Sequence, residues 1–87
     1  MEYFVYIIFS NSYNIYYNGF TTDPQKRLIQ HNNNESRFTA GKGSWKLVYL
    51  EKFTSKKEAL VKEKKLKRSN SSYIKWLIGQ PINMLNE

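Results

Sequence analysis

The sequence predicts an α+β domain, a three-stranded antiparallel sheet flanked by helices, with its elements in the order β-β-α-β-α-α. Three observations lead to this prediction. Two aromatic and β-branched runs near the N-terminus enclose a turn-rich pentapeptide, two later segments begin with strong helix caps, and 87 residues allow one hydrophobic core. Residues 1–80 would form the domain, and residues 81–87 a loosely ordered tail.

The first two strands are expected to form a hairpin. Tyr3–Phe9 is apolar at both alternating positions, which is typical of a central strand buried on both faces. Residues 10–14 supply the turn, and Ile15–Phe20 follows as the second strand. Gly19, near the end of that strand, lacks a Cβ and so permits either a close approach to the backbone or a bulge.

A helix follows the hairpin, because Asp23 is a good N-cap and Pro24 suits the first helical position. This helix would end near Asn32. The polar segment from Glu35 to Trp45 is a loop long enough to be functional, and it leads to a third strand at Lys46–Phe53.

Strict alternation along the third strand assigns its side chains to two faces. Leu47, Tyr49 and Phe53 should share one face of the sheet. Val48 and Leu50 should lie on the other. Both faces are therefore apolar, and helices are expected to cover both.

The second helix is predicted to begin with a capping box formed by Ser55 and Glu58. Its inward stripe is apolar at helical spacing: Ala59, Leu60 and Leu66. Glu63 falls in the middle of this stripe, on the side shared by Lys56 and Lys67. A carboxylate there is costly unless a positive group meets it. Glu63 is either half of a buried ion pair, with Lys67 or an arginine of another element, or a metal-binding or acid–base carboxylate.

A last short helix ends at Gly79. Tyr73, Trp76 and Leu77 occur in it at helical spacing, and we expect Tyr73 and Trp76 to close the core. The alternative is that these aromatic rings, with Lys75 between them, stack on nucleic-acid bases.

The charge of the chain is +7 and unevenly distributed. Residues 1–43 carry four basic and three acidic side chains, a net of +1, whereas residues 44–87 carry ten and four, a net of +6. This asymmetry favours a polyanionic partner, most simply nucleic acid. A lysine-rich helix can also be only a solubilising face.

The composition excludes several classes of protein. The chain has no cysteine and one histidine, which excludes disulfides and thiolate metal sites and argues against structural zinc. The apolar run at the N-terminus is too short to span a bilayer and has no basic residues before it. We therefore expect a soluble cytoplasmic protein.

A small set of polar residues remains as candidates for chemistry. Tyr6 and Tyr17 lie on neighbouring strands, Arg27 and His31 share one helix face, and Glu63 lies on the second helix. Each has a structural alternative: strand tyrosines are often half-buried in sheets, arginines often lie on helix surfaces, and a histidine at a helix C-terminus is favoured by the dipole.

The order of these residues forms a pattern. F-V-Y near the N-terminus is followed after ten residues by Y-N-G, then by R-x-x-x-H starting eight residues after that glycine, and then by A-L-x-x-E-K-x-L-K. The pattern resembles the GIY-YIG nuclease superfamily, and most nearly its small stand-alone members similar to the N-terminal domain of the bacterial excision-repair nuclease. The resemblance extends from Tyr3 to about Ile78. Phe4 replaces the glycine of the first motif, and Asn18 replaces an apolar residue of the second; we expect a packing change from Asn18.

The resemblance implies a metal-dependent DNA endonuclease and assigns roles to the candidate residues. The catalytic set would be Tyr6, Tyr17, Arg27, His31 and Glu63. Arg27 would bind the scissile phosphate, and Glu63 would hold one divalent ion, Mg²⁺ or Mn²⁺. Nucleic acid, DNA rather than RNA, would be contacted at the remaining positions: Gly19, Lys56, Lys64 and Lys67.

The chemistry of phosphodiester hydrolysis agrees with these residue types. It needs an activated water and positive charge on the phosphate. One carboxylate completed by waters and phosphate oxygens suits Mg²⁺, and the planar guanidinium of Arg27 matches phosphate oxygens. We expect Tyr6 to be the general base, its phenolate made accessible by nearby positive charge and its proton passing to His31. Tyr17 is the second candidate.

Two other functions are consistent with the sequence. One is a non-catalytic nucleic-acid-binding module that keeps the fold and the basic helix. The other is a partner-binding domain whose charge is incidental. The complete set of polar residues favours the nuclease, because an unpaired buried charge is hard to keep without a use. The basic surface would contact phosphates without reading sequence.

Overall fold

The computed structural model describes residues 1–86, and this part of the chain contains three strands and three α-helices. The strands are β1 (Tyr3–Ser10), β2 (Ile15–Thr21) and β3 (Trp45–Phe53). The helices are α1 (Pro24–Asn32), α2 (Lys56–Lys67) and α3 (Ser71–Ile78), followed by the 3₁₀ helix η1 (Met84–Asn86). The predicted fold class and element order are confirmed. No helix within residues 1–86 is both long enough and apolar enough to cross a membrane.

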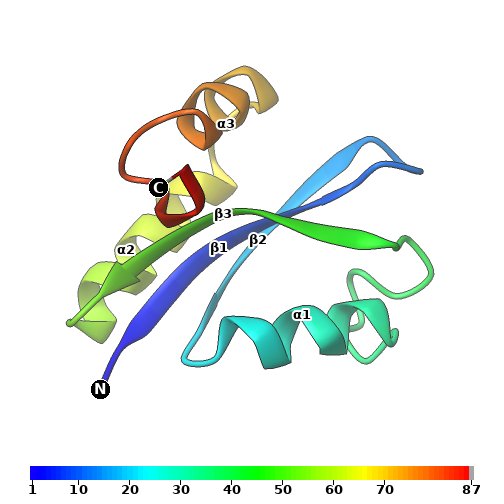
Figure 1. Ribbon diagram of the computed structural model, residues 1–87, viewed down its shortest axis with the longest axis horizontal. Coiled ribbons are helices and arrows are strands. Elements are labelled where there is room, and N and C mark those ends of the chain that lie inside the picture. Colours follow the sequence, from blue (N-terminus) through cyan, green and yellow to red (C-terminus); the bar gives the residue numbers. More distant parts are fainter. Residues whose placement is uncertain (87) are drawn as a thin grey trace.

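β1 occupies the centre of the sheet, between β2 and β3, and pairs with both in antiparallel orientation (Figure 1). Its side chains are buried on both faces: Val5 and Ile7 on one, Tyr6 and Ile8 on the other. This is the pattern from which the central position was predicted, and the prediction is confirmed.

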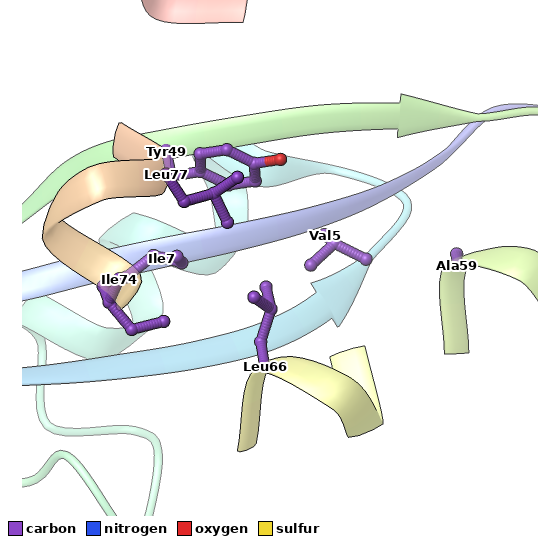
Figure 2. Packing of buried hydrophobic residues seen from close by; sticks show 7 residues of the cluster. All are labelled: Val5, Ile7, Tyr49, Ala59, Leu66, Ile74 and Leu77. Carbon is purple, nitrogen blue, oxygen red and sulfur yellow. The ribbon is translucent and has the colours of Figure 1, made fainter. Parts of the chain in front are cut away.

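The helices cover the two faces of the sheet separately, with α2 and α3 on one side and α1 on the other (Figure 1). The larger core lies under α2 and α3, where Leu66, Ile74 and Leu77 point toward Val5 and Ile7 (Figure 2). The smaller core, under α1, contains buried aromatic and aliphatic residues: Tyr6, Ile8 and Trp45. The candidate site belongs to the α1 face, since Tyr6 is part of this smaller core.

A bulge in β3 changes the predicted assignment of its faces. Ile7 pairs with Tyr49 but Ile8 pairs with Leu47, so one residue of β3 has no partner at that point. As a result Leu47 joins Leu50 on the α1 face, and Val48 joins Tyr49 on the other. The prediction of strict alternation was wrong here because an inserted residue inverts the pattern on one side of the bulge.

The helix starts follow the predicted chemistry. Asp23 Oδ1 accepts a hydrogen bond from the backbone N–H of Lys26 (3.2 Å), and Ser55 Oγ accepts one from Glu58 (3.3 Å). These bonds satisfy N–H groups that have no partner within the helix. The caps therefore fix where α1 and α2 begin, and with them the positions of the candidate site residues on both helices.

Two predictions about helix faces were wrong. Leu60 is 40% exposed, whereas Ala59 and Leu66 are buried, so the inward stripe of α2 is narrower than predicted. Trp76 is 58% exposed and does not close the core, because Ile74 and Leu77 already fill the space between α3 and the sheet. Tyr73 packs against that core only in part.

The C-terminal segment is tied to the sheet by one buried asparagine. The side chain of Asn83 donates to the carbonyls of Val48 and Ile78 (2.9 Å each) and accepts from the backbone N–H groups of Leu50 and Leu85 (3.1 Å each). Residues 83–86 thus differ from the expected loose tail, since the amide of Asn83 replaces missing backbone partners of β3 and α3. Glu87 lies outside the described residues.

Candidate active site

Tyr6 and His31 meet beneath α1. Even-numbered residues of β1 face this helix, and His31 lies in its last turn. The Tyr6 hydroxyl and Nε2 of His31 are 2.8 Å apart, and the two side chains are 2% and 0% exposed. The structure therefore brings together two of the predicted residues that lie 25 positions apart in sequence.

Thr39 extends this pair into a chain of hydrogen bonds. Its Oγ1 lies 2.7 Å from Nδ1 of His31, and its hydroxyl donates to the carbonyl of Ser36 (3.5 Å). A hydroxyl that donates to Ser36 accepts from Nδ1–H, which leaves Nε2 as the acceptor for the proton of Tyr6. Thr39 was not among the residues predicted from the sequence, and the only signal for it was its place in the loop predicted to be functional.

Burial sets the protonation states of both rings. It raises the pKa of Tyr6 from 10.0 to about 12, although the nearby guanidinium of Arg27 lowers it. It lowers the pKa of His31 from 6.5 to about 4, and the charge of Arg27 adds to this effect. Both side chains are therefore neutral at pH 7. Desolvation thus outweighs the charge of Arg27 alone, and the expectation that Arg27, a metal ion and phosphate-bound cations together make the Tyr6 phenolate accessible stays a prediction.

Arg27 lies one helical turn before His31, on the same side of α1. It is half-buried, and its Nη1 donates to the side-chain oxygen of Gln30 (3.1 Å). Its positive charge lowers the pKa of Tyr6, so the guanidinium lies within electrostatic reach of the phenol. Remaining donors of the guanidinium are available to an anion that approaches Tyr6.

Gly19 provides the space that Tyr6 occupies. The two residues are directly paired across β1 and β2. A Cβ added to Gly19 would lie 2.6 Å from Cζ of Tyr6, which is closer than real side chains allow. The glycine of the second motif is thus required by the ring of the first motif, consistent with the predicted close approach.

Tyr17 lies between the buried pair and the surface. Its ring packs edge-on against His31, with centroids 5.4 Å apart, and lies 5.5 Å from the ring of Phe38. Nζ of Lys67, from α2, is 5.6 Å from the centroid of Tyr17. Tyr17 therefore connects the α1 face of the sheet with the C-terminal half of α2.

Glu63 reaches the site from the opposite face, at the edge of the sheet formed by β2. Its side chain is 20% exposed, and one carboxylate oxygen is 3.7 Å from Nζ of Lys67. Its charge raises the pKa of Tyr6, so the carboxylate lies within electrostatic reach of the phenol. The pairing with Lys67 is the ion pair that the sequence left open, at a distance longer than a strong charge-assisted hydrogen bond.

Asn18 fixes the backbone next to this carboxylate. Its side chain points away from Tyr17, and Nδ2 donates to the backbone carbonyl of Glu63 (3.0 Å). The residue that departs from the second motif thus connects β2 directly to α2. An apolar residue at this position could not make this contact, and the expected packing change relative to the family pattern stays a prediction.

A surface hollow on α2 also contains Glu63. The residues that line it are mostly basic or apolar: Lys56, Lys57, Leu60, Val61, Glu63 and Lys64. Glu63, with a side chain that is 20% exposed, thus shares this hollow with the predicted nucleic-acid-binding residues Lys56 and Lys64. Within residues 1–86 no three acidic, histidine or cysteine side chains converge as a metal site, so a metal ion here would have Glu63 as its protein carboxylate.

The fold and this arrangement of tyrosine, histidine, arginine and glutamate define a class of small nuclease-like α+β domains. The chain belongs to the GIY-YIG family, since the GIY-YIG catalytic domain matches residues 2–76.

Among proteins of known sequence, the chain is similar to small UPF0213 proteins. It is 37% identical to the UPF0213 protein of Listeria welshimeri over 78 residues, covering 84% of this chain and 86% of that protein. It is also 37% identical to a UPF0213 protein of Staphylococcus epidermidis over 67 residues, covering 76% and 80%. The solution NMR structure of a UPF0213 protein from Bacillus halodurans, 28% identical, superposes with a TM-score of 0.62 over 99% of this chain and 92% of that one.

Proposed function

We propose that the protein is a metal-dependent endonuclease that hydrolyses phosphodiester bonds in DNA by in-line attack of water. The observation that carries this proposal is the buried Tyr6–His31 hydrogen bond of 2.8 Å, with Arg27 and Glu63 both acting on the same phenol. Membership of the GIY-YIG family and the net charge of +7 support a nucleic-acid substrate.

Arg27 binds the scissile phosphate. Its half-buried guanidinium is held by Gln30 and lies beside Tyr6, so a phosphate that engages it is placed next to the phenol. Planar guanidinium groups pair with two phosphate oxygens at once, which also fixes the orientation of the bond to be cleaved. Charge that develops on the phosphate in the transition state is stabilised by the same contact.

Tyr6 accepts a proton from the attacking water, and its own proton is directed at His31. The neutral imidazole presents Nε2 as an acceptor, while Thr39 holds Nδ1. The raised pKa of Tyr6, about 12, means that the phenol needs additional positive charge before it can act. Tyr17, which packs on His31, is the second candidate for the base.

Glu63 holds the divalent ion, Mg²⁺ or Mn²⁺. The donor set fits, because one partly exposed carboxylate is enough for an ion that keeps several waters and takes phosphate oxygens from its substrate. When bound, the ion supplies positive charge that lowers the pKa of water and of nearby groups. Lys67, whose ammonium group lies 3.7 Å from the carboxylate, is the cation with which such an ion would compete for Glu63.

Nicking of supercoiled plasmid DNA with Mg²⁺ or Mn²⁺ tests the proposal. Glu63→Gln and Arg27→Ala should each reduce the rate at least a hundredfold, since each removes a group that contacts the reacting phosphate or its ion. Glu58→Gln, an exposed carboxylate on the same helix, is the matched control and should keep the rate.

The outcomes separate two functions. Cleavage that survives both Glu63→Gln and Arg27→Ala would exclude this site. Salt-sensitive DNA binding by the wild-type protein, with no cleavage under any metal, would instead establish the non-catalytic nucleic-acid-binding module.

A further inference from the structure

Beside the proposed active site lies a row of two aromatic rings and two ammonium groups, which we call the aromatic row: Lys42, Phe38, Tyr17 and Lys67. Nζ of Lys42 is 5.0 Å from the centroid of Phe38, whose ring is 5.5 Å from that of Tyr17. Nζ of Lys67 is 5.6 Å from the centroid of Tyr17 at the other end. Single exposed apolar residues need no explanation. Two rings flanked by ammonium groups, however, match the base and the phosphates of a nucleotide.

Phe38 is the exposed member of the row. Its side chain is 67% exposed, although the residues around it are fixed. Thr39 is buried against His31, and its carbonyl accepts a hydrogen bond from Nε1 of Trp45 (3.2 Å). The carbonyl of Ser36 accepts one from Ala40 (2.9 Å). The ring is thus held at the surface by an anchored loop, which reduces the entropy lost when a ligand binds to it.

The aromatic row adjoins the reacting groups. Tyr17 contacts Phe38 on one side and His31 on the other, with centroids 5.5 and 5.4 Å away, and His31 bonds to Tyr6. Arg27 lies one helical turn before His31, so a phosphate held there would be on the same side of α1 as the row. Phe38 is the member of the row suited to a base, since stacking needs an accessible ring face.

We propose that the aromatic row binds an unpaired nucleobase next to the cleaved phosphate, so that the preferred substrate is single-stranded or locally unpaired nucleic acid. The proposal rests on the nuclease function and narrows its substrate. A base within a duplex is stacked on both faces, whereas an unpaired base can stack on Phe38. Base stacking is stronger than an exposed cation–π contact, so the base displaces Lys42 from the ring and leaves its ammonium group for a phosphate.

Binding of a single-stranded oligonucleotide that contains 2-aminopurine, measured in EDTA, tests this. Stacking changes the fluorescence of 2-aminopurine, and EDTA removes the divalent ion, so no cleavage is needed. We expect Phe38→Ala and Phe38→Leu to weaken single-strand binding about tenfold. Phe38→Trp should retain it. Leucine is the informative change, because it keeps an apolar side chain and removes the flat ring.

Two controls make the result specific. A hairpin duplex of the same length should lose less than twofold in affinity with Phe38→Ala. Trp76→Ala, which removes a comparably exposed aromatic (58%) from the opposite face of the sheet, should leave single-strand binding unchanged. Equal urea midpoints of the variants establish that each is folded.

The proposal is overturned if Phe38→Ala has no effect, if it weakens duplex and single strand equally, or if Trp76→Ala has the larger effect. The last result would assign base stacking to α3. Because the measurement needs no cleavage, an inactive protein that still loses single-strand affinity with Phe38→Ala would refute the nuclease function and keep the base-binding site.

Discussion

Gly19 and Tyr6 illustrate how closely the residues of the site depend on each other. The ring of Tyr6 occupies the volume that a Cβ on Gly19 would need, with 2.6 Å from that Cβ to Cζ. Tyr6 in turn is held by His31, and His31 by Thr39. A change at Gly19 is therefore transmitted along the whole chain of hydrogen bonds.

Gly19→Ala should lower the free energy of unfolding by about 1–3 kcal/mol, because the phenol has to move in a packed core. Urea denaturation measures this loss. Gly79→Ala is the control, since a Cβ there meets nothing nearer than 3.6 Å and its φ of −83° suits alanine. Equal losses at both glycines would contradict the close approach to Tyr6.

His31 should make stability depend on pH. Its pKa is about 4 in the folded protein and 6.5 when unfolded. Above pH 6.5 the histidine is neutral in both states, and its full contribution to the free energy of unfolding is present. As pH falls from 6.5 toward 4, the unfolded chain binds a proton that the folded chain does not. The free energy of unfolding therefore decreases with a slope that approaches the value for one bound proton, about 1.4 kcal/mol per pH unit.

The comparison of wild type with His31→Gln isolates this effect from the acidic residues. The difference in urea midpoint between the two proteins should be largest above pH 6.5 and should shrink as pH falls toward 4. A difference that stays constant over this range would mean that His31 is not kept neutral by burial.

At the scale of the elements, the sequence predicted what local chemistry determines. The caps at Asp23 and Ser55 and the apolar faces of β1 were sufficient to predict the helices and the central strand. Alternation alone could not reveal the bulge in β3. The extra residue is recognised only because Ile7 pairs with Tyr49 while Ile8 pairs with Leu47.

The candidate site shows the same division. Tyr6, Arg27 and His31 could be singled out by spacing and family resemblance. Thr39 could not, because its contact with His31 depends on the path of an irregular loop. The protonation of Tyr6 was also out of reach, since it follows from the balance between burial and Arg27 that only coordinates give.

The C-terminal segment is an element whose importance was underestimated from its sequence. Asn83→Ala should lower the free energy of unfolding by about 2–3 kcal/mol, since it removes the side-chain partner of the Leu50 N–H and the Val48 carbonyl in β3. Asn86→Ala should cost less, about 1 kcal/mol, because its amide donates to the carbonyls of Ile78 and Gln80 at an exposed position where water can replace it. Chemical denaturation distinguishes the two, and equal small losses would mean that the segment is loosely held after all.

For the molecule as a whole, charge is the property that decides encounter with a substrate. The net charge of +7 resides mostly in residues 44–87, with a net of +6, and Lys56 and Lys64 lie beside Glu63 on α2. A polyanion attracted to this half of the protein approaches the carboxylate at the β2 edge. If nucleic acid is the substrate, as proposed, this unequal distribution would favour its approach to the proposed site over the surface at large.

Duplex binding in EDTA, measured by fluorescence anisotropy between 50 and 200 mM KCl, should weaken linearly on logarithmic axes. Lys56→Ala and Lys64→Ala should each reduce the slope by about 0.9, the value expected when the protein neutralises one phosphate fewer. Lys52→Ala is the matched control, because its ammonium group is already paired with Glu2 (3.2 Å) on the N-terminal side of the sheet. A change in slope with Lys52→Ala as large as with Lys64→Ala would show that total charge, and not the position of the lysines on α2, governs binding.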